Sequence, residues 1–199
     1  MSKYYFEGSP ILAPLTIQST DVVVSSETVT LKRLIHKTDA QRWDLSFGIV
    51  TNDNEDAIFL AMLENAYTVK TMDMPQLKKV DDTTTMTGSL SVSVNYVAGA
   101  TSIQANNTSG GVLPKGSFIQ FANHTKVYVV KSDYLTNGSS LAIYPALKQD
   151  VSGSTLVYYG NFSTKPQLSY LRDDSELSGI TYSDGILVSI GAVTIKEVV

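Results

Sequence analysis

The stretch 115–147 constrains the fold most, because short β-prone runs alternate there with turn residues. Two of its runs, 118–121 and 126–131, are rich in phenylalanine, isoleucine, valine and tyrosine, which suit a half-buried pleated surface. A polar turn separates these runs, and Asn137-Gly138, a strong hairpin signal, precedes a third run. We therefore predict a self-contained run of β-structure.

The same succession of β-prone runs and turn residues extends over residues 88–160. Apolar and polar residues alternate in 89–96, and a closing β-prone run occupies 154–159. Taken together, five or six short strands are separated by tight turns, a spacing typical of a small barrel or sandwich. We predict a small β-barrel domain over 88–160, inserted into the chain between Thr87 and Asn161.

The clearest strand of the flanking segments is 42–50, where apolar and polar side chains alternate strictly. A period of two predicts a sheet with one face in a core. The residues predicted to face that core are Trp43, Leu45, Phe47 and Ile49. Shorter strands are expected at 21–24 and 28–31, whereas Pro10 and Pro14 are expected to keep the first fourteen residues out of regular structure.

One amphipathic helix is predicted over 53–67. Asn52 is a suitable N-cap, and four apolar residues follow at helical spacing, namely Phe59, Met62, Leu63 and Ala66. Neither 1–87 nor 161–199 closes a sheet alone. We therefore predict a mainly β protein, in which these two segments form one discontinuous β-sandwich domain with this single α-helix, interrupted by the barrel.

Composition limits the possible functions. The net charge of −4 and the pI of 5.1 argue against a phosphate-binding surface as the main function, so we expect no sequence-specific nucleic-acid binding. The absence of cysteine excludes disulfides and thiolate chemistry. The N-terminus has no signal-peptide pattern, and no apolar run approaches the ~20 residues that span a bilayer. We expect folding in a cytoplasm without membrane insertion.

No residues suggest a reactive site. The two histidines, His36 and His124, fall on different sides of the predicted boundary, and His124 lies in a turn, where a solvated loop residue is expected. No nucleophile elbow is present, and the acidic pairs 81–82 and 173–174 fit loops that flank strands. We predict no catalytic, cofactor-binding or metal-binding residues, and no enzymatic activity.

Tyrosines are the remaining candidates for ligand binding in the barrel. Tyr128, Tyr134 and Tyr144 could be exposed and stack on a sugar or a single-stranded nucleic acid. The alternative is that they pack in the core, as strand aromatics usually do.

At this point the sequence resembles a known family. The strand around Trp43, the helix at 53–67 and a barrel with the pattern KGSFIQF, KVYVV and LAIYPAL, which starts at Lys115, resemble the distal tail proteins of long-tailed siphophages. The resemblance covers most of 41–147. It implies that the insertion is similar to an oligonucleotide/oligosaccharide-binding (OB) barrel.

The resemblance implies a structural role in the virion. Such proteins form a hexameric ring at the phage tail tip, which joins the tail tube protein to the hub or tip proteins and passes DNA. We expect subunits to complete one another's sheets through edge strands. The candidate ring-interface residues lie in the segments 21–31 and 186–198 and are Val22, Val24, Val29, Leu31, Val193 and Ile195.

Two other functions stay open. The barrel could be a carbohydrate-binding module that recognises a host-surface glycan during adsorption. The chain could also be a tail-tube or tail-completion protein of the same phage lineage.

Overall fold

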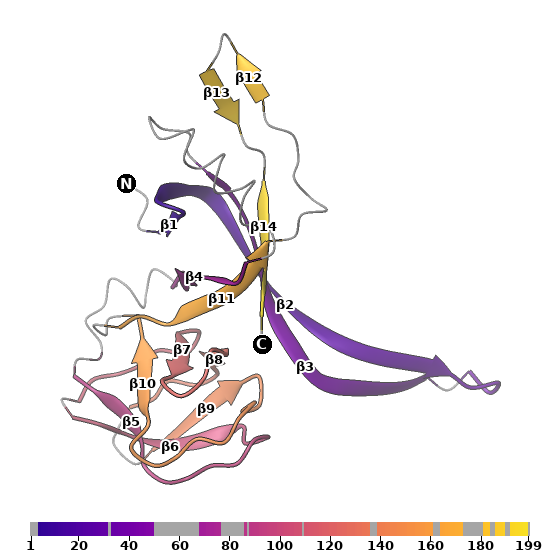
Figure 1. Cartoon of the computed structure of the whole chain (residues 1–199). Coiled ribbons are helices and arrows are strands. Elements are labelled where there is room, and N and C mark those ends of the chain that lie inside the picture. Colours follow the sequence, from indigo (N-terminus) through magenta and orange to yellow (C-terminus); the bar gives the residue numbers. More distant parts are fainter. Residues whose placement is uncertain are drawn as a thin grey trace. The chain divides into compact units, whose positions relative to one another are not determined.

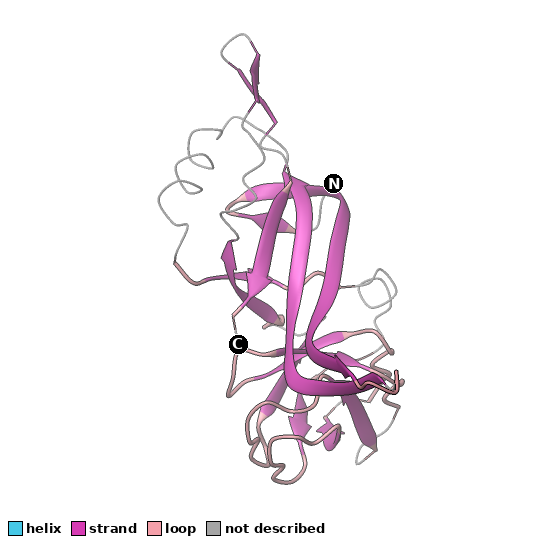
Figure 2. Cartoon of the chain, turned by 90° about the vertical axis from the view of Figure 1, so that its right-hand side faces the viewer, coloured by secondary structure: helices cyan, strands magenta, loops and turns pink. Residues whose placement is uncertain are grey.

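The computed structural model describes residues 4–31, 33–49, 68–76, 86, 88–108, 110–135, 139–160, 164–172, 181–183, 186–189 and 192–198. Within these ranges the chain is mainly β, as predicted, and contains no helix (Figure 2). The predicted helix at 53–67 lies outside the described residues, and so do both acidic pairs.

The chain divides into two compact units. The first, which we call the sheet unit, comprises residues 1–72 and 169–199, and the second, the barrel unit, comprises residues 73–168. The limits predicted from the sequence, at Thr87 and Asn161, both lie within the barrel unit. Its additional residues are the two segments that lead into and out of the barrel.

A six-stranded sheet dominates the sheet unit. Its order is β1 (Tyr5–Phe6), β2 (Ser9–Glu27), β3 (Arg33–Ile49), β14 (Val193–Glu197), β11 (Gln167–Arg172) and β4 (Lys70–Asp73) (Figure 1). Strands from the two ends of the sequence are therefore neighbours, with Val193 of β14 opposite Phe47 of β3. A separate two-stranded ribbon is formed by β12 (Thr181–Ser183) and β13 (Ile186–Ser189).

The predicted alternation in β3 is confirmed. Trp43, Leu45, Phe47 and Ile49 are all buried, whereas the residues between them are only partly buried. The ring of Phe6 packs against Phe47, at 5.2 Å between ring centroids. A strictly alternating strand thus places one apolar face in the core, as the pleat requires.

The prediction that Pro10 and Pro14 exclude regular structure is wrong, since both lie within β2. Pro10 stands opposite Tyr5 of the two-residue strand β1, and Pro14 falls where the β2–β3 register shifts between Leu12 and Thr16. Sheets tolerate proline at an edge or a bulge, because the missing amide hydrogen is not needed for the ladder there.

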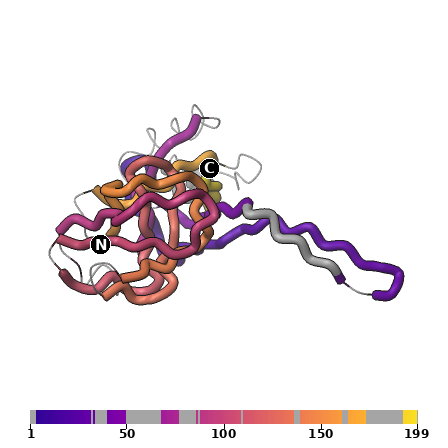
Figure 3. Tube along the Cα trace, turned by 90° about the horizontal axis from the view of Figure 1, so that it is seen from below, coloured from indigo at the N-terminus to yellow at the C-terminus, as the bar shows by residue number. Residues whose placement is uncertain are grey.

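The barrel is closed and has six strands, in agreement with the predicted number. The strands are β5 (Leu90–Val92), β6 (Ser102–Asn107), β7 (Phe118–Phe121), β8 (Val127–Val130), β9 (Ser140–Tyr144) and β10 (Leu156–Tyr159), in the closed order β10-β5-β6-β9-β8-β7. Figure 3 shows the course of the chain through the barrel. All neighbouring pairs are antiparallel. The order β6-β9-β8-β7 is a Greek key. An OB fold has five strands, so this barrel is larger by one.

The core of the barrel is filled from all six strands. Its members include Leu90, Ile103, Phe121, Tyr128, Leu141 and Val157, each with no exposed surface. Buried phenols have partners: Tyr134 donates to the carbonyl oxygen of Ala105 at 2.8 Å, and Tyr159 donates to that of Gly88 at 2.5 Å. Hydrogen bonds therefore compensate the burial of these two hydroxyl groups.

The segments that enter and leave the barrel are attached to it by two glutamine side chains. The Gln76 amide donates to the carbonyl oxygen of Phe118 at 3.1 Å and accepts from its N–H at 2.9 Å. The Gln120 amide forms the same pair of bonds with the backbone of Gln167, both at 3.0 Å. The Gln76 side chain thus pairs with the backbone of β7 at Phe118, and the Gln120 side chain of β7 pairs with the backbone of β11 at Gln167.

Candidate functional site

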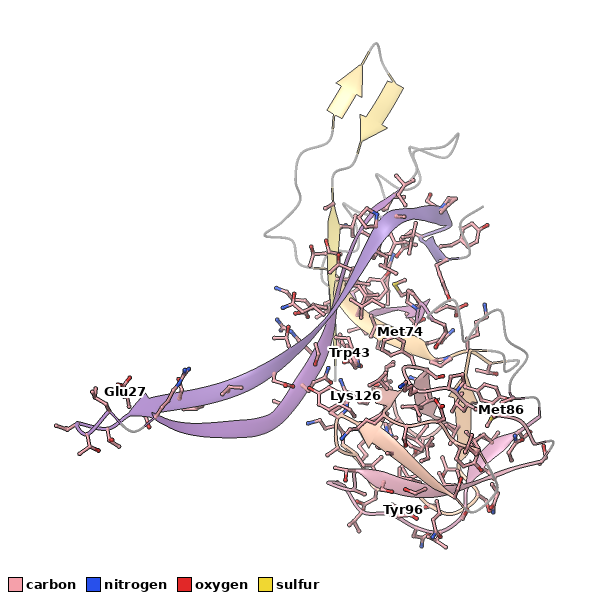
Figure 4. All side chains as sticks on the ribbon, turned by 180° about the vertical axis from the view of Figure 1, so that it is seen from behind. Glu27, Trp43, Met74, Met86, Tyr96 and Lys126 are labelled. Carbon is pink, nitrogen blue, oxygen red and sulfur yellow. The ribbon has the colours of Figure 1, made fainter. Side chains whose placement is uncertain are left out.

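The most unusual feature of the described residues is a long two-stranded arm. We define the arm as residues 21–31 and 33–41, where β2 and β3 pair with each other from Asp21–Gln41 to Glu27–Arg33. The arm extends beyond the sheet in Figure 1, and Figure 4 shows Glu27 near its outer end and Trp43 at its base. At the tip, the N–H of Leu31 donates to the carbonyl oxygen of Thr28 at 2.8 Å.

Neighbouring strands flank only the base of this hairpin. Among the strands that the structure describes, β14 pairs with β3 only from Asp44 to Phe47, and β1 pairs with β2 only at Ser9 and Pro10. The register shift between Asp21 and Val23 marks where the arm begins. A β-bulge at such a point increases local twist and bends the strand away from the sheet.

Polar contacts fix the base of the arm. Thr20 donates to Oδ2 of Asp44 at 2.6 Å, and the Gln41 amide donates to the hydroxyl of Ser19 at 3.1 Å. Arg42 forms an ion pair with Asp44, with Nε 3.0 Å from Oδ1. The two hydrogen bonds link β2 to β3, whereas the ion pair lies within β3, so the arm starts from a fixed position on the sheet.

Apolar side chains of the arm are exposed. Val22, Val24 and Leu31 expose 52%, 56% and 80% of their surface, and Val29 at the tip is fully exposed. These are four of the six predicted ring-interface residues. An exposed two-stranded hairpin is marginally stable by itself, and open strand edges with apolar side chains tend to pair with another chain. The arm therefore has the properties of a protein–protein contact.

The prediction that 186–198 offers an edge for ring contacts needs correction at Val193 and Ile195. Both side chains are buried, and β14 is hydrogen-bonded to β3 on one side and β11 on the other. A strand with neighbours on both sides has no free edge, so these two residues belong to the core of the sheet. The sequence did not reveal that a C-terminal strand inserts between two earlier ones.

The prediction of exposed tyrosines is also wrong for two of the three residues. Tyr128 and Tyr134 are buried in the barrel core, and only Tyr144 keeps part of its surface accessible. Tyrosine favours β-strands, and its side chain can be buried in a closed barrel because the hydroxyl finds a hydrogen-bond partner there. Burial also raises the pKa of Tyr134. These rings cannot stack on a ligand without opening the barrel.

His124 is buried rather than solvated as predicted. Its Nε2 lies 2.9 Å from the hydroxyl of Tyr128, and its Nδ1 lies 3.1 Å from Oδ1 of Asn123. Burial lowers its pKa to about 4, so the ring is neutral at pH 7.

The other histidine, His36, lies on the arm, opposite Val24. No group of three or more His, Asp or Glu residues within the described ranges could hold a metal ion.

Comparisons with known proteins do not assign the chain to a family. No protein-family model matches the chain, and a search of curated proteins finds no match. No helix in the described part of the chain is long and apolar enough to cross a membrane.

Proposed function

We propose that this chain is a structural virion protein of a phage tail tip, which assembles into a hexameric ring through its arm. The observation that carries the proposal is the set of exposed apolar side chains on the β2 half of the arm and at its tip, namely Val22, Val24, Val29 and Leu31. The resemblance to distal tail proteins supplies the biological setting, and the described geometry supplies a surface suited to assembly.

Ring closure needs two different surfaces on each subunit, one that projects and one that receives. A projecting hairpin with exposed valines meets the first requirement, because heterologous contacts repeat from subunit to subunit until the rotation closes. Val22, Val23 and Val24 follow one another on β2 and are all about half exposed, so the start of the arm offers a short apolar segment. Full burial of an exposed apolar side chain contributes about 1.5–3 kcal/mol, so covering the exposed half of Val22 or Val24 contributes roughly half of that at a subunit contact.

The remaining parts of the proposal follow from the same resemblance. The ring joins the tail tube protein to the hub or tip proteins, and DNA passes through it. The helix at 53–67 and a second layer that completes a β-sandwich belong to this proposal, as does the similarity of the barrel to an OB fold. Assembly takes place in the host cytoplasm, and the mature location is the tail tip of the virion.

Glycan binding by the barrel has less support than assembly. Its proposed aromatic platform consisted of Tyr128, Tyr134 and Tyr144, and two of these are buried. A tail-tube protein would assemble through the same arm. Its rings would stack into tubes, whereas a tail-tip protein would form a single ring.

The test is the mass of the purified full chain by light scattering, with negative-stain images of the same fraction. We expect a six-subunit ring at high protein concentration, and a monomer for the double variant Val22→Ser/Val24→Ser. The matched control is Val94→Ser/Val97→Ser, because Val94 and Val97 on the barrel are 50% and 71% exposed and lie outside the arm. If both double variants lost assembly equally, or if neither lost it, the result would contradict a role for the arm.

A further inference from the structure

A glutamate side chain joins the two ends of the six-stranded sheet. Glu7 lies in the turn between β1 and β2, at one end of the strand order, and Lys70 is the first residue of β4, at the other end. Oε1 of Glu7 accepts a hydrogen bond from Nζ of Lys70 at 2.7 Å. The same oxygen accepts one from the hydroxyl of Tyr170 on β11 at 3.1 Å. We call these three side chains the clasp.

The clasp requires a curled sheet. From β2 the strand order runs through β3, β14 and β11 to β4, four strand spacings that amount to roughly 19 Å in a flat sheet. The charged atoms of Glu7 and Lys70 nevertheless lie in contact, and Figure 1 shows β1 and β4 on the same side of β14. The two ends of the sheet therefore approach each other. Within the described residues, side chains rather than a backbone ladder connect the β1–β2 turn to β4.

The residues that carry Glu7 cover part of the core face of this sheet. We call residues 4–8 the strap. Its Phe6 is 2% exposed and packs against Phe47 on β3 and Tyr170 on β11, with 5.2 and 5.7 Å between ring centroids. β1 has two residues, so its backbone ladder with β2 is short. Displacement of the strap would therefore expose an aromatic part of the core.

The backbone at Glu7 is unusual for this type of residue. Glu7 and Gly8 form the two-residue turn between Phe6 and Ser9, and both have a positive φ, +48° and +82°. Such turns favour Asn, Asp or Gly at the first position, because a larger side chain is strained in the left-handed region. Turn preference does not account for a glutamate here, whereas the bonds of its carboxylate within the clasp do.

The clasp is largely shielded from water. The side chains of Lys70 and Glu7 are 24% and 22% exposed. Burial, together with the negative charge of Glu7, raises the pKa of Tyr170, so the phenol keeps its proton and donates to the carboxylate at neutral pH. Hydrogen bonds to charged groups contribute more than neutral ones, and salt screens partly buried pairs less than exposed ones. The carboxylate of Glu7 is therefore the main polar attachment of the strap.

The edge strand that the clasp holds is suited to strand pairing. β4 is the last strand of the order, and Val69 and Thr71, near its start, are exposed. Both are β-branched, and open strand edges with such residues tend to pair with another chain. A strand that adds to β4 has to enter the gap that the clasp spans, so the two ends of the sheet must first separate.

We infer that the strap is autoinhibitory: the clasp holds the two ends of the sheet together and thereby keeps β4 from pairing with β4 of a second copy of this chain. A second copy is the partner because identical edge strands can pair across a twofold axis, each supplying the same surface. The arm differs, since it projects and needs a different receiving surface. The clasp therefore directs association to the arm, and the inference goes beyond the ring proposed above.

Hydrogen exchange of the full chain tests whether the clasp holds the strap. The amide of Ile11 reports the strap, because it donates to the carbonyl oxygen of Tyr4 at 3.0 Å. The amide of Val198 reports the sheet itself, because it donates to the carbonyl oxygen of Ser169 at 2.9 Å. We expect Glu7→Asn to accelerate exchange of Ile11 about tenfold, since hydrogen bonds to a charged group are lost, and to leave Val198 unchanged.

The choice of asparagine separates the clasp from the turn. Asparagine favours the left-handed backbone of this position, but its shorter, neutral side chain does not replace the carboxylate. If the turn alone held the strap, Glu7→Asn would slow exchange of Ile11, and the inference would be overturned.

Lys70→Met breaks the same ion pair without a change in the turn. It should also accelerate exchange of Ile11, and the double variant with Glu7→Asn should fall short of the product of the two single effects, because both remove one contact. Fully independent effects would mean that the two side chains do not act together, and the clasp would be refuted. If Glu7→Asn does not fold, the effect of Lys70→Met on Ile11 decides.

Light scattering tests the autoinhibition on chains whose arm carries Val22→Ser/Val24→Ser. We expect Glu7→Asn in this background to form dimers at high protein concentration, and Thr71→Lys, which places a charge on the edge of β4, to restore the monomer. The chains are compared within one background, so the result does not depend on whether the arm forms a ring. An unchanged mass despite accelerated exchange of Ile11 would overturn the autoinhibitory role.

Discussion

The barrel and the arm use the same kind of residues with opposite results. In the barrel, β-branched and aromatic side chains turn inward, every strand has two neighbours, and the ladder closes on itself. In the arm, two strands pair with each other, and valines such as Val22 and Val24 remain exposed. A β-prone sequence therefore does not decide by itself whether a strand is buried or exposed; closure of the sheet does.

The barrel and the arm differ in how far their strand edges and apolar side chains are covered within the described residues. A closed barrel has no free edge and satisfies its own backbone, so it needs no other chain. An isolated two-stranded hairpin buries little apolar surface, so it gains most when it contacts another chain. Substitutions should therefore affect folding in the barrel and association in the arm.

The largest expected effect is loss of barrel stability in Phe121→Ala. The Phe121 side chain has no exposed surface and contacts the Tyr128 ring at 5.3 Å between centroids, so its truncation leaves a cavity in the closed core. We expect the free energy of unfolding to fall by about 3–5 kcal/mol. The matched change on the arm, Val29→Ala at its exposed tip, should cost no more than about 0.5 kcal/mol.

Urea unfolding measures both effects. Trp43 is the only tryptophan and lies in the sheet unit, so its fluorescence reports on that unit. Near-ultraviolet circular dichroism also reports on the tyrosines buried in the barrel. Phe121→Ala should lower the midpoint of the barrel transition. An equal loss of stability in Val29→Ala would mean that the arm is folded as firmly as the barrel.

A smaller effect is expected for Gln120→Ala, which removes one attachment of the barrel. The N–H and C=O of Gln167 lose their partner, and the carbonyl oxygen of Thr125 loses a donor at 2.9 Å. Partly buried backbone groups left without partners cost about 1–3 kcal/mol. The control is Gln104→Ala, because Gln104 is exposed on β6. Equal unfolding midpoints for the two variants would contradict a stabilising role for this contact.

Much of the barrel could be predicted from the sequence, because its signals are local. Short β-prone runs and tight turns follow one another between Gly88 and Gly160, and all six strands of the barrel lie there. Strict alternation likewise predicted the buried face of β3, since the period of two depends only on the pleat. These are properties of neighbouring residues.

Long-range pairing could not be predicted in the same way. The sequence predicts two short strands at 21–24 and 28–31, joined by a turn at Ser25-Ser26-Glu27, and it predicts no arm. In the structure these three residues continue β2 opposite β3, and the turn lies at 28–31. The burial of Val193, Tyr128 and His124 likewise depends on partners distant in sequence, which local patterns do not show.

The most direct comparison of the two regions is one substitution made in both. Val92 on β5 is 1% exposed, and Val92→Thr places a hydroxyl in the barrel core, where an unpaired polar group costs about 1–3 kcal/mol. Val24→Thr makes the same chemical change on the exposed arm and keeps the β-branched shape, so the free energy of monomer unfolding should change by less than about 0.5 kcal/mol. Light scattering of Val24→Thr then isolates its effect on assembly. If Val24→Thr destabilised the monomer as much as Val92→Thr, the arm would already be packed within its own subunit, and the contrast between a complete barrel and an incomplete arm would fail.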